Sequence, residues 1–249
     1  MNSGFINKLK KKKITFDKLR DEKNYFEILR RLISYNLPRG LIYLGGSDLL
    51  RLEIDGLQIK KEPNNCLVRQ ATLDDLDEIL TLVEEPPLPV REKLFRGYFN
   101  DGHECYALIT DDQIIGYLWA FSNSYSMTYD DYVNTLININ IECGSICLGD
   151  ALINPSYRGR GLYPFLMKEI SNKKRVVGTK KLYAFIGSHN EHSLNIHRGF
   201  GFVNYMSFRY FTVFNIKLLS IYKIKSLQRY LRIGKKSFYN TITCEIDKS

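Results

Sequence analysis

The residue types best suited to chemistry gather in one short stretch, "INPSYRGRGLYPFLM" at 153–167. An Arg-Gly-Arg-Gly turn at 158–161 follows an apolar segment and precedes a run with helical spacing. Glycine permits positive φ and close approach of the backbone to a ligand, and the first amides of a helix lack intrahelical acceptors. Arginine pairs well with phosphate oxygens. Pro164 suits a first helical turn, so we expect the helix to begin near Leu162 and the turn to bind an anion.

The turn does not match the common nucleotide-binding patterns. No G-K-S/T follows it, which argues against a P-loop, and the chain lacks G-x-G-x-x-G. A tight strand-to-helix turn with solvated arginines is the structural alternative. The five cysteines have no C-x-x-C spacing, so we predict no metal site, reduced thiols and a cytoplasmic protein.

The elements that position this turn follow the order β-α-β-β-β-α-β-α-β, which predicts a mixed sheet with helices on both sides. We expect strands at 67–70, 104–110, 114–121, 139–155, 180–187 and 203–214, and helices from Thr72, near 163–174 and at 190–199. Residues 86–103 and 122–137 show no pattern and are expected to be loops. Together these elements predict one domain over residues 66–212.

The net charge of +9 is concentrated in the two flanks, 1–65 and 213–249. We expect 1–65 to be an N-terminal extension, with a basic arm, a helix at 15–36, and a short strand, Gly-Gly turn and second short segment at 41–54. The basic segment 216–233 could be an amphipathic helix on an anionic membrane, could pack on the domain, or could form extra strands. Because the charge lies in the flanks, we expect no nucleic-acid binding. No apolar run reaches the length of a transmembrane helix, and the N-terminus lacks the apolar region of a secretory signal.

Two motifs resemble those of one family. "INPSYRGRGLYPFLM" resembles motif A of the GNAT superfamily of N-acetyltransferases, Q/R-x-x-G-x-G/A after a strand that ends near a proline. "NEHSLNIHRGFGF" at 190–202 resembles a second GNAT motif, N-x-x-S/A followed after seven residues by G-F. The matching positions are Arg158, Gly161, Asn190, Ser193, Gly201 and Phe202, and Tyr163 departs from the last Gly/Ala of motif A. The resemblance covers about 66–212. It implies an α/β fold of the GNAT type, a mixed and mostly antiparallel central sheet flanked by helices, preceded here by the helical extension.

The resemblance also implies acetyl coenzyme A as cosubstrate, with its diphosphate in the 158–163 loop and its pantetheine arm along the strand that ends at Ile153. Asn190 would hydrogen-bond that arm, and a helix N-cap is its structural alternative. The implied cofactor-binding residues are Leu152, Ile153, Arg158, Gly159, Arg160, Gly161, Leu162, Tyr163, Asn190 and Ser193.

Two residues are the catalytic candidates. Many GNAT members carry a tyrosine seven residues after the motif asparagine, as proton donor to the departing thiolate, and His197 stands there in this chain. Some relatives carry an acid at the position of Gly149, and Asp150 is the best local carboxylate. An incidental helix histidine and a hydrogen-bonded strand aspartate are the alternatives. We predict transfer of an acetyl group to an amine of a small molecule, sugar or peptide; a non-catalytic acyl-CoA-binding module and a homodimer remain open.

Overall fold

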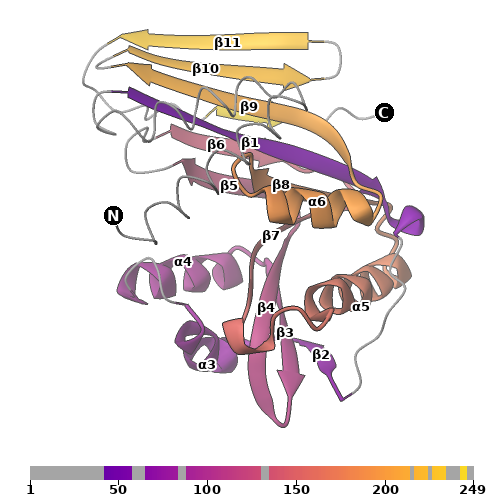
Figure 1. Cartoon of the computed structure of the whole chain (residues 1–249). Coiled ribbons are helices and arrows are strands. Elements are labelled where there is room, and N and C mark those ends of the chain that lie inside the picture. Colours follow the sequence, from indigo (N-terminus) through magenta and orange to yellow (C-terminus); the bar gives the residue numbers. More distant parts are fainter. Residues whose placement is uncertain are drawn as a thin grey trace, which may run out of the picture.

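The computed structural model describes residues 42–57, 65–83, 88–129, 135–213, 216–223, 226–233 and 242–245. The basic arm and the helix expected at 15–36 lie outside the described residues. Figure 1 shows a large twisted sheet with helices on its two faces and a smaller sheet beside it.

Within these ranges the large sheet has nine strands in the order β11-β10-β9-β1-β8-β7-β4-β3-β2. All neighbouring strands are antiparallel except β7 and β8, which are parallel. The strands are β1 (Ile42–Glu53), β2 (Leu67–Gln70), β3 (Glu104–Thr110), β4 (Gln113–Phe121), β7 (Ser145–Ile153), β8 (Lys181–Gly187), β9 (Val203–Val213), β10 (Ile216–Lys223) and β11 (Ser226–Ile233). The small sheet contains β5 (Ser124–Tyr129), β6 (Thr135–Asn140) and β12 (Ile242–Glu245). The predicted fold class, a mixed and mostly antiparallel sheet flanked by helices, is confirmed.

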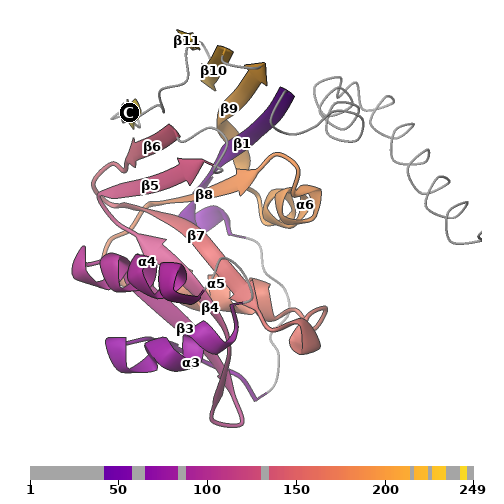
Figure 2. The same ribbon diagram turned by 90° about the vertical axis from the view of Figure 1, so that its left-hand side faces the viewer.

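The two faces of the sheet carry separate apolar cores. Helices α3 (Leu76–Thr81) and α4 (Leu88–Asn100) share one core with Tyr125 and Ile139 of the small sheet. Helices α5 (Leu162–Val176) and α6 (Glu191–Gly199) contribute to the second core. Figure 2 shows this division, with α3 and α4 on the side of the sheet opposite to α5. Apolar side chains on alternate positions of the same strands serve both cores, which is why several strands read as continuous apolar runs.

Strand β1 differs most from the sequence-based expectation. Residues 41–54 were expected to form two short segments around a Gly-Gly turn, but 42–53 form one 12-residue strand. It pairs with β8 from Ser47↔Gly187 onward and with β9 on its other edge. Gly46 serves close packing here, because a Cβ on it would lie 2.8 Å from the carbonyl oxygen of Phe208. The segment 1–65, predicted as an extension, therefore supplies a strand inside the sheet.

Three further expectations were wrong. The loop expected at 86–103 contains α4, and the loop expected at 122–137 contains β5 and the start of β6. The single strand region expected at 139–155 is the end of β6 and all of β7, which lie in different sheets. Gly144, with φ of +76°, turns the chain between them.

The basic segment 216–233 forms extra strands, one of the three options that its sequence allowed. Strands β10 and β11 pair antiparallel from Ile216↔Ile233 to Lys223↔Ser226. Within the described part of the chain, no helix is long and apolar enough to cross a membrane.

Candidate functional site

The parallel strands β7 and β8 diverge from one another halfway along their length. They pair from Ser145↔Lys181 to Leu148↔Ala184, and the described pairing stops there. Beyond that point β7 continues to Ile153 alongside β4, while β8 continues to Gly187 alongside β1. Figure 2 shows the two strands separating. The facing edges of the two strands offer backbone donors and acceptors to an extended ligand, as a sheet edge does in strand addition.

A β-bulge interrupts β7 inside the diverging part. Leu118 of β4 faces Ala151 and Trp119 faces Gly149, so that Asp150 is the extra residue. Asp150 has a left-handed φ of +49°. Bulges of this kind redirect a side chain, and they occur often beside active sites.

The Asp150 carboxylate is held by Arg91 of α4. Two guanidinium nitrogens donate to its two oxygens at 3.0 and 3.1 Å. Both side chains are mostly buried, with 18% of Arg91 and 13% of Asp150 exposed. Burial raises the pKa of Asp150, and the positive charge of Arg91 opposes that rise.

The arginine-glycine loop connects the end of β7 to α5. The Nε of Arg158 donates to the carbonyl oxygen of Ile153 at 2.9 Å. Arg160 donates to the carbonyl of Ser156 and lies over the ring of Tyr157. Each guanidinium has five N–H donors, so these contacts hold the loop and leave donors on both arginines for an anion.

The two glycines make the loop open. Gly159 and Gly161 have φ of +79° and +78°, and a Cβ built on either would meet no atom within 4 Å. Gly161 is the N-cap of α5, whose first turn carries no acidic residue. The backbone amides of Leu162 and Tyr163, in the first turn, have no acceptor within the helix. Pro164 has no amide hydrogen, so it needs no acceptor. This geometry favours a phosphate group.

The other predicted cofactor residues lie on β7, on α5 and at the start of α6, and they differ in burial. The side chains of Ile153 and Leu162 are buried, with 9% and 5% exposed, so these residues can contact a ligand mainly through their backbone. Leu152 is partly buried. Asn190 caps α6, its Oδ1 accepting from the amide of Ser193 at 3.1 Å. That cap leaves the Asn190 Nδ2 group as a donor.

His197 joins α5 to α6 and is almost completely buried, with 2% exposed. Its Nδ1 donates to the carbonyl of Ser193 at 2.8 Å, which leaves Nε2 as an acceptor for the Tyr163 hydroxyl at 3.0 Å. Burial lowers the pKa of His197 and raises the pKa of Tyr163. The histidine is therefore neutral at pH 7, with both ring nitrogens engaged.

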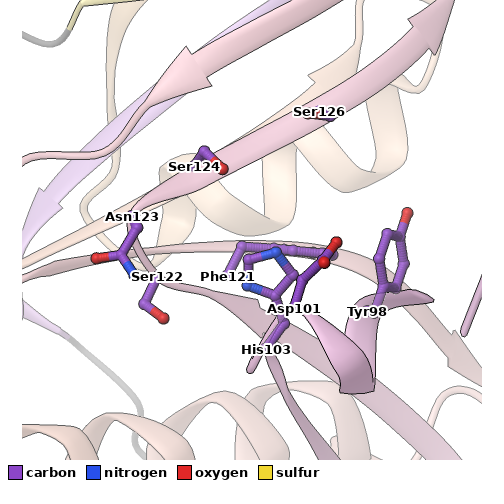
Figure 3. A pocket seen from close by; sticks show the side chains of 8 residues that line it. All are labelled: Tyr98, Asp101, His103, Phe121, Ser122, Asn123, Ser124 and Ser126. Carbon is purple, nitrogen blue, oxygen red and sulfur yellow. The ribbon is translucent and has the colours of Figure 1, made fainter. Parts of the chain in front are cut away.

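The structure brings together two segments in which the sequence showed no pattern. The end of α4, the residues that follow it and the turn between β4 and β5 line an open cavity of about 400 Å³. Figure 3 shows its lining side chains, which are Tyr98, Asp101, His103, Phe121, Ser122, Asn123, Ser124 and Ser126. This cavity is separate from the loop at 158–161.

Sequence reasoning missed two residues at the divergence. Nothing in the sequence indicated a role for Arg91, because its partner Asp150 lies 59 positions away. Tyr125 of β5 packs its ring against Gly149, where a Cβ would meet its hydroxyl at 3.2 Å, and against Phe185 of β8 at 5.9 Å. It thus covers one side of the point where β7 and β8 separate. Within the described ranges, no group of three His, Cys, Asp or Glu side chains could hold a metal ion.

The sequence model of the acetyltransferase (GNAT) family matches residues 70–202, more than half of the chain. The chain belongs to the GNAT family. The matched range of this GNAT protein includes the bulge, the arginine-glycine loop and α6, whereas β1, β10 and β11 lie outside it.

Several solved structures match the chain at low sequence identity. A functionally unknown conserved protein from Staphylococcus epidermidis is 10% identical, with a TM-score of 0.50 over 74% of this chain and 65% of the other. A Drosophila protein is 15% identical, with a TM-score of 0.46 over 86% of this chain and 58% of the other. A GNAT family acetyltransferase from Brucella melitensis, in complex with acetyl-CoA, is 15% identical, with a TM-score of 0.37 over 49% and 76%. The GNAT chain thus spans less than two thirds of the first two proteins. Among curated proteins, none matches the chain.

Proposed function

We propose that this GNAT protein transfers an acetyl group from acetyl-CoA to an amine. The observation that carries the proposal is the divergence of β7 and β8, which leads directly into the open arginine-glycine loop at the start of α5. An extended arm ending in a diphosphate fits this arrangement, since the strand edges suit the amides of the arm and the loop suits the phosphates.

The residues present fit acetyl-CoA on chemical grounds. The amides and glycines of 159–163 would hold the diphosphate, and Arg158 and Arg160 would add charge-assisted hydrogen bonds. The backbone of Leu152 and Ile153 would pair with the pantetheine arm. The Nδ2 group of Asn190 would donate hydrogen bonds to that arm. Ser193 lies beside Asn190, because the backbone amide of Ser193 donates to the Asn190 Oδ1.

The reaction needs a neutral amine, a stabilised oxyanion and a departing thiol. The amine nitrogen attacks the thioester carbonyl carbon, the C–N bond forms, and the C–S bond breaks. The amine nitrogen loses one proton and the departing thiolate gains one, so the reaction is balanced. Backbone N–H groups of β7 beyond Leu148 are the candidate oxyanion donors.

Asp150 is the proposed contact for the incoming ammonium group. A carboxylate has about four acceptor sites, and Arg91 occupies two of them. Burial raises the pKa of Asp150, which favours acceptance of a proton from the ammonium. His197 is proposed to position Tyr163 beside the cofactor loop, because its Nε2 already accepts the tyrosine hydroxyl.

Binding is the first test, and residue 159 allows a matched pair of variants. Asp and Asn both tolerate the left-handed φ of this position and differ in charge. We expect Gly159→Asp to weaken acetyl-CoA binding at least tenfold, about 1.4 kcal/mol, and Gly159→Asn to change it much less. Gly178→Asp, at the opposite end of α5 and also at positive φ, controls for added charge. Calorimetric titration gives the dissociation constants, and equal affinity in all three variants would refute the proposed loop contact.

Turnover is the second test. Release of free CoA with a panel of amines would support the transferase, whereas tight acetyl-CoA binding without turnover of any amine would favour the non-catalytic acyl-CoA-binding module.

A further inference from the structure

Tyr125 of β5 lies at the point where β7 and β8 separate. The last described pair between these strands is Leu148↔Ala184, so Gly149 and Phe185 are the next residue of each strand. A Cβ built on Gly149 would meet the Tyr125 hydroxyl at 3.2 Å, and the ring centroids of Tyr125 and Phe185 lie 5.9 Å apart. The tyrosine ring therefore lies beside the first residue of both strands beyond their parallel pairing.

Packing holds the Tyr125 side chain in this place. Along β5, Ser124 and Ser126 line the open cavity (Figure 3), whereas Tyr125 between them points to the opposite face and is 6% exposed. Its ring packs against Phe121 with the centroids 4.6 Å apart, and Gly149 leaves room for it because glycine has no Cβ. Within the described residues, no group is hydrogen-bonded to the Tyr125 hydroxyl. The hydroxyl is therefore available as a donor at the strand separation.

The proposed binding mode brings the thioester to the same place. The pantetheine arm is proposed to start at the arginine-glycine loop and to pair with the backbone of Ile153 and Leu152. Gly149 lies four residues before Ile153, which is about 13 Å along a strand. An arm that follows this edge of β7 thus brings its thioester end toward Gly149 and Tyr125.

The departing thiolate needs a proton donor, and the donors expected on α5 and α6 are already engaged. The Nδ1 of His197 donates to the carbonyl of Ser193, and its Nε2 accepts the hydroxyl of Tyr163. The only N–H of the neutral ring and the only O–H of Tyr163 are both used by these two bonds. Tyr125 has a hydroxyl without such a partner.

The surroundings of Tyr125 keep its hydroxyl protonated. Burial raises its pKa, and the groups whose charge acts on it are Cys147 and Asp150 of β7 and Tyr98 and Arg91 of α4. The charges of Asp150 and Arg91 form an ion pair and oppose one another. Burial also raises the pKa of the Cys147 thiol. A CoA thiolate that is desolvated in this interior is therefore more basic as well, and it competes for the tyrosine proton.

We propose that Tyr125 is the proton donor to the departing CoA thiolate. The inference rests on the proposed acetyl transfer and adds a catalytic residue to it. As the amine nitrogen bonds to the thioester carbon and the C–S bond breaks, Tyr125 gives its hydroxyl proton to the sulfur. The phenolate that remains regains the proton that the amine has lost to Asp150, so protons and charges balance.

The test is calorimetric titration of the full-length chain with CoA and with desulfo-CoA, which lacks only the sulfur atom. At pH 9, above the ordinary thiol pKa of about 8.5, much of the CoA is thiolate. We expect Tyr125→Phe to weaken CoA binding by about tenfold or more, since a hydrogen bond to a charged group is lost, and to change desulfo-CoA binding by less than about twofold. At pH 6.5 the variant should bind CoA nearly as tightly as the wild type, because a neutral thiol is a weak acceptor.

Tyr205→Phe is the matched control. It removes a hydroxyl from the same apolar core, beside Tyr183 in the paired part of β8, and should leave both affinities unchanged. Circular dichroism confirms that each variant is folded. Equal losses with CoA and desulfo-CoA, or no loss with either, would overturn the inference, while wild-type binding would leave the cofactor proposal standing. A folded wild type that binds neither compound would refute the proposed transferase and this inference together.

Turnover gives a second readout. With an amine that the panel identifies as an acceptor, Tyr125→Phe should lower kcat about a hundredfold and change the KM for acetyl-CoA by less than about threefold. A rise in KM with unchanged kcat would instead assign the hydroxyl to binding alone and would overturn its role as proton donor.

Discussion

The guanidinium of Arg91 in α4 and the carboxylate of Asp150 in β7 form a bidentate ion pair between residues 59 positions apart in the sequence. The pair fixes a bulge residue in a left-handed conformation at the point where β7 leaves β8. It also fastens α4 to the sheet between the proposed reaction centre and the cavity that α4 helps to line.

Loss of Arg91 should destabilise the protein in a pH-dependent way. Arg91→Gln leaves a buried carboxylate without its charge partner, and we expect a loss of about 3 kcal/mol in the free energy of unfolding at pH 7. Burial already raises the pKa of folded Asp150, and removal of Arg91 raises it further. A raised carboxyl pKa costs stability as pH rises through it, so the variant should lose more at pH 7 than at pH 5. Urea unfolding at both pH values measures this. Arg96→Gln, which breaks the exposed pair with Glu92, should cost less than about 1 kcal/mol; a similar loss in both variants would contradict the prediction.

His197 should make the fold sensitive to mild acid. Its pKa is lowered by burial, so below the ordinary histidine pKa of about 6.5 the unfolded chain binds more protons than the folded one. Stability should therefore fall between pH 7 and pH 5, and the fall should be smaller in His197→Gln. His192→Gln, at an exposed position of the same helix, should keep the wild-type slope.

The same variants test the catalytic candidate. If His197 only positions Tyr163, the pH profile of kcat should keep its shape in His197→Gln while its amplitude falls. Loss of one limb of that profile would instead support direct proton donation by His197.

Strand β1 should be essential for folding. Leu50 is 0% exposed and lies in the strand between β8 and β9, so Leu50→Ala should cost about 2–5 kcal/mol. Leu67→Ala, in β2 with 59% of the residue exposed, is the matched control and should change the free energy of unfolding by about 0.5 kcal/mol or less. Equal denaturation midpoints for wild type and Leu50→Ala would place β1 outside the cooperative unit.

Cysteine reactivity should follow burial. Cys105 and Cys147 are buried, which raises the pKa of both thiols, whereas Cys143 is exposed. Iodoacetamide at pH 8 should label Cys143 in the native protein, and Cys105 and Cys147 only after unfolding. Peptide mass spectrometry locates the label, and Cys143→Ser identifies the signal of that site. Native labelling of Cys147 would indicate that the interior near the divergence of β7 and β8 opens in solution.

The sequence predicted the features that depend on neighbouring residues. Gly159 and Gly161 before Pro164 indicated an open turn and the start of a helix, because φ preferences and helix caps are local properties. Short apolar runs bounded by turn residues indicated β2, β3, β4, β8 and β9 and the segment that contains β7. The N-cap role of Asn190 was likewise open to sequence reasoning, since the capping partner, Ser193, lies three residues away.

The tertiary structure decided every feature that depends on distant partners. No local signal shows that β1 lies between β8 and β9, because a strand buried on both faces lacks alternation and its glycines resemble a turn. The contact between Tyr163 and His197, the ion pair of Arg91 with Asp150, and the cavity between 98–103 and 121–126 all join segments far apart in the chain. Local sequence determines which backbone conformations are low in energy, and the burial of both sheet faces selects which segments pack together.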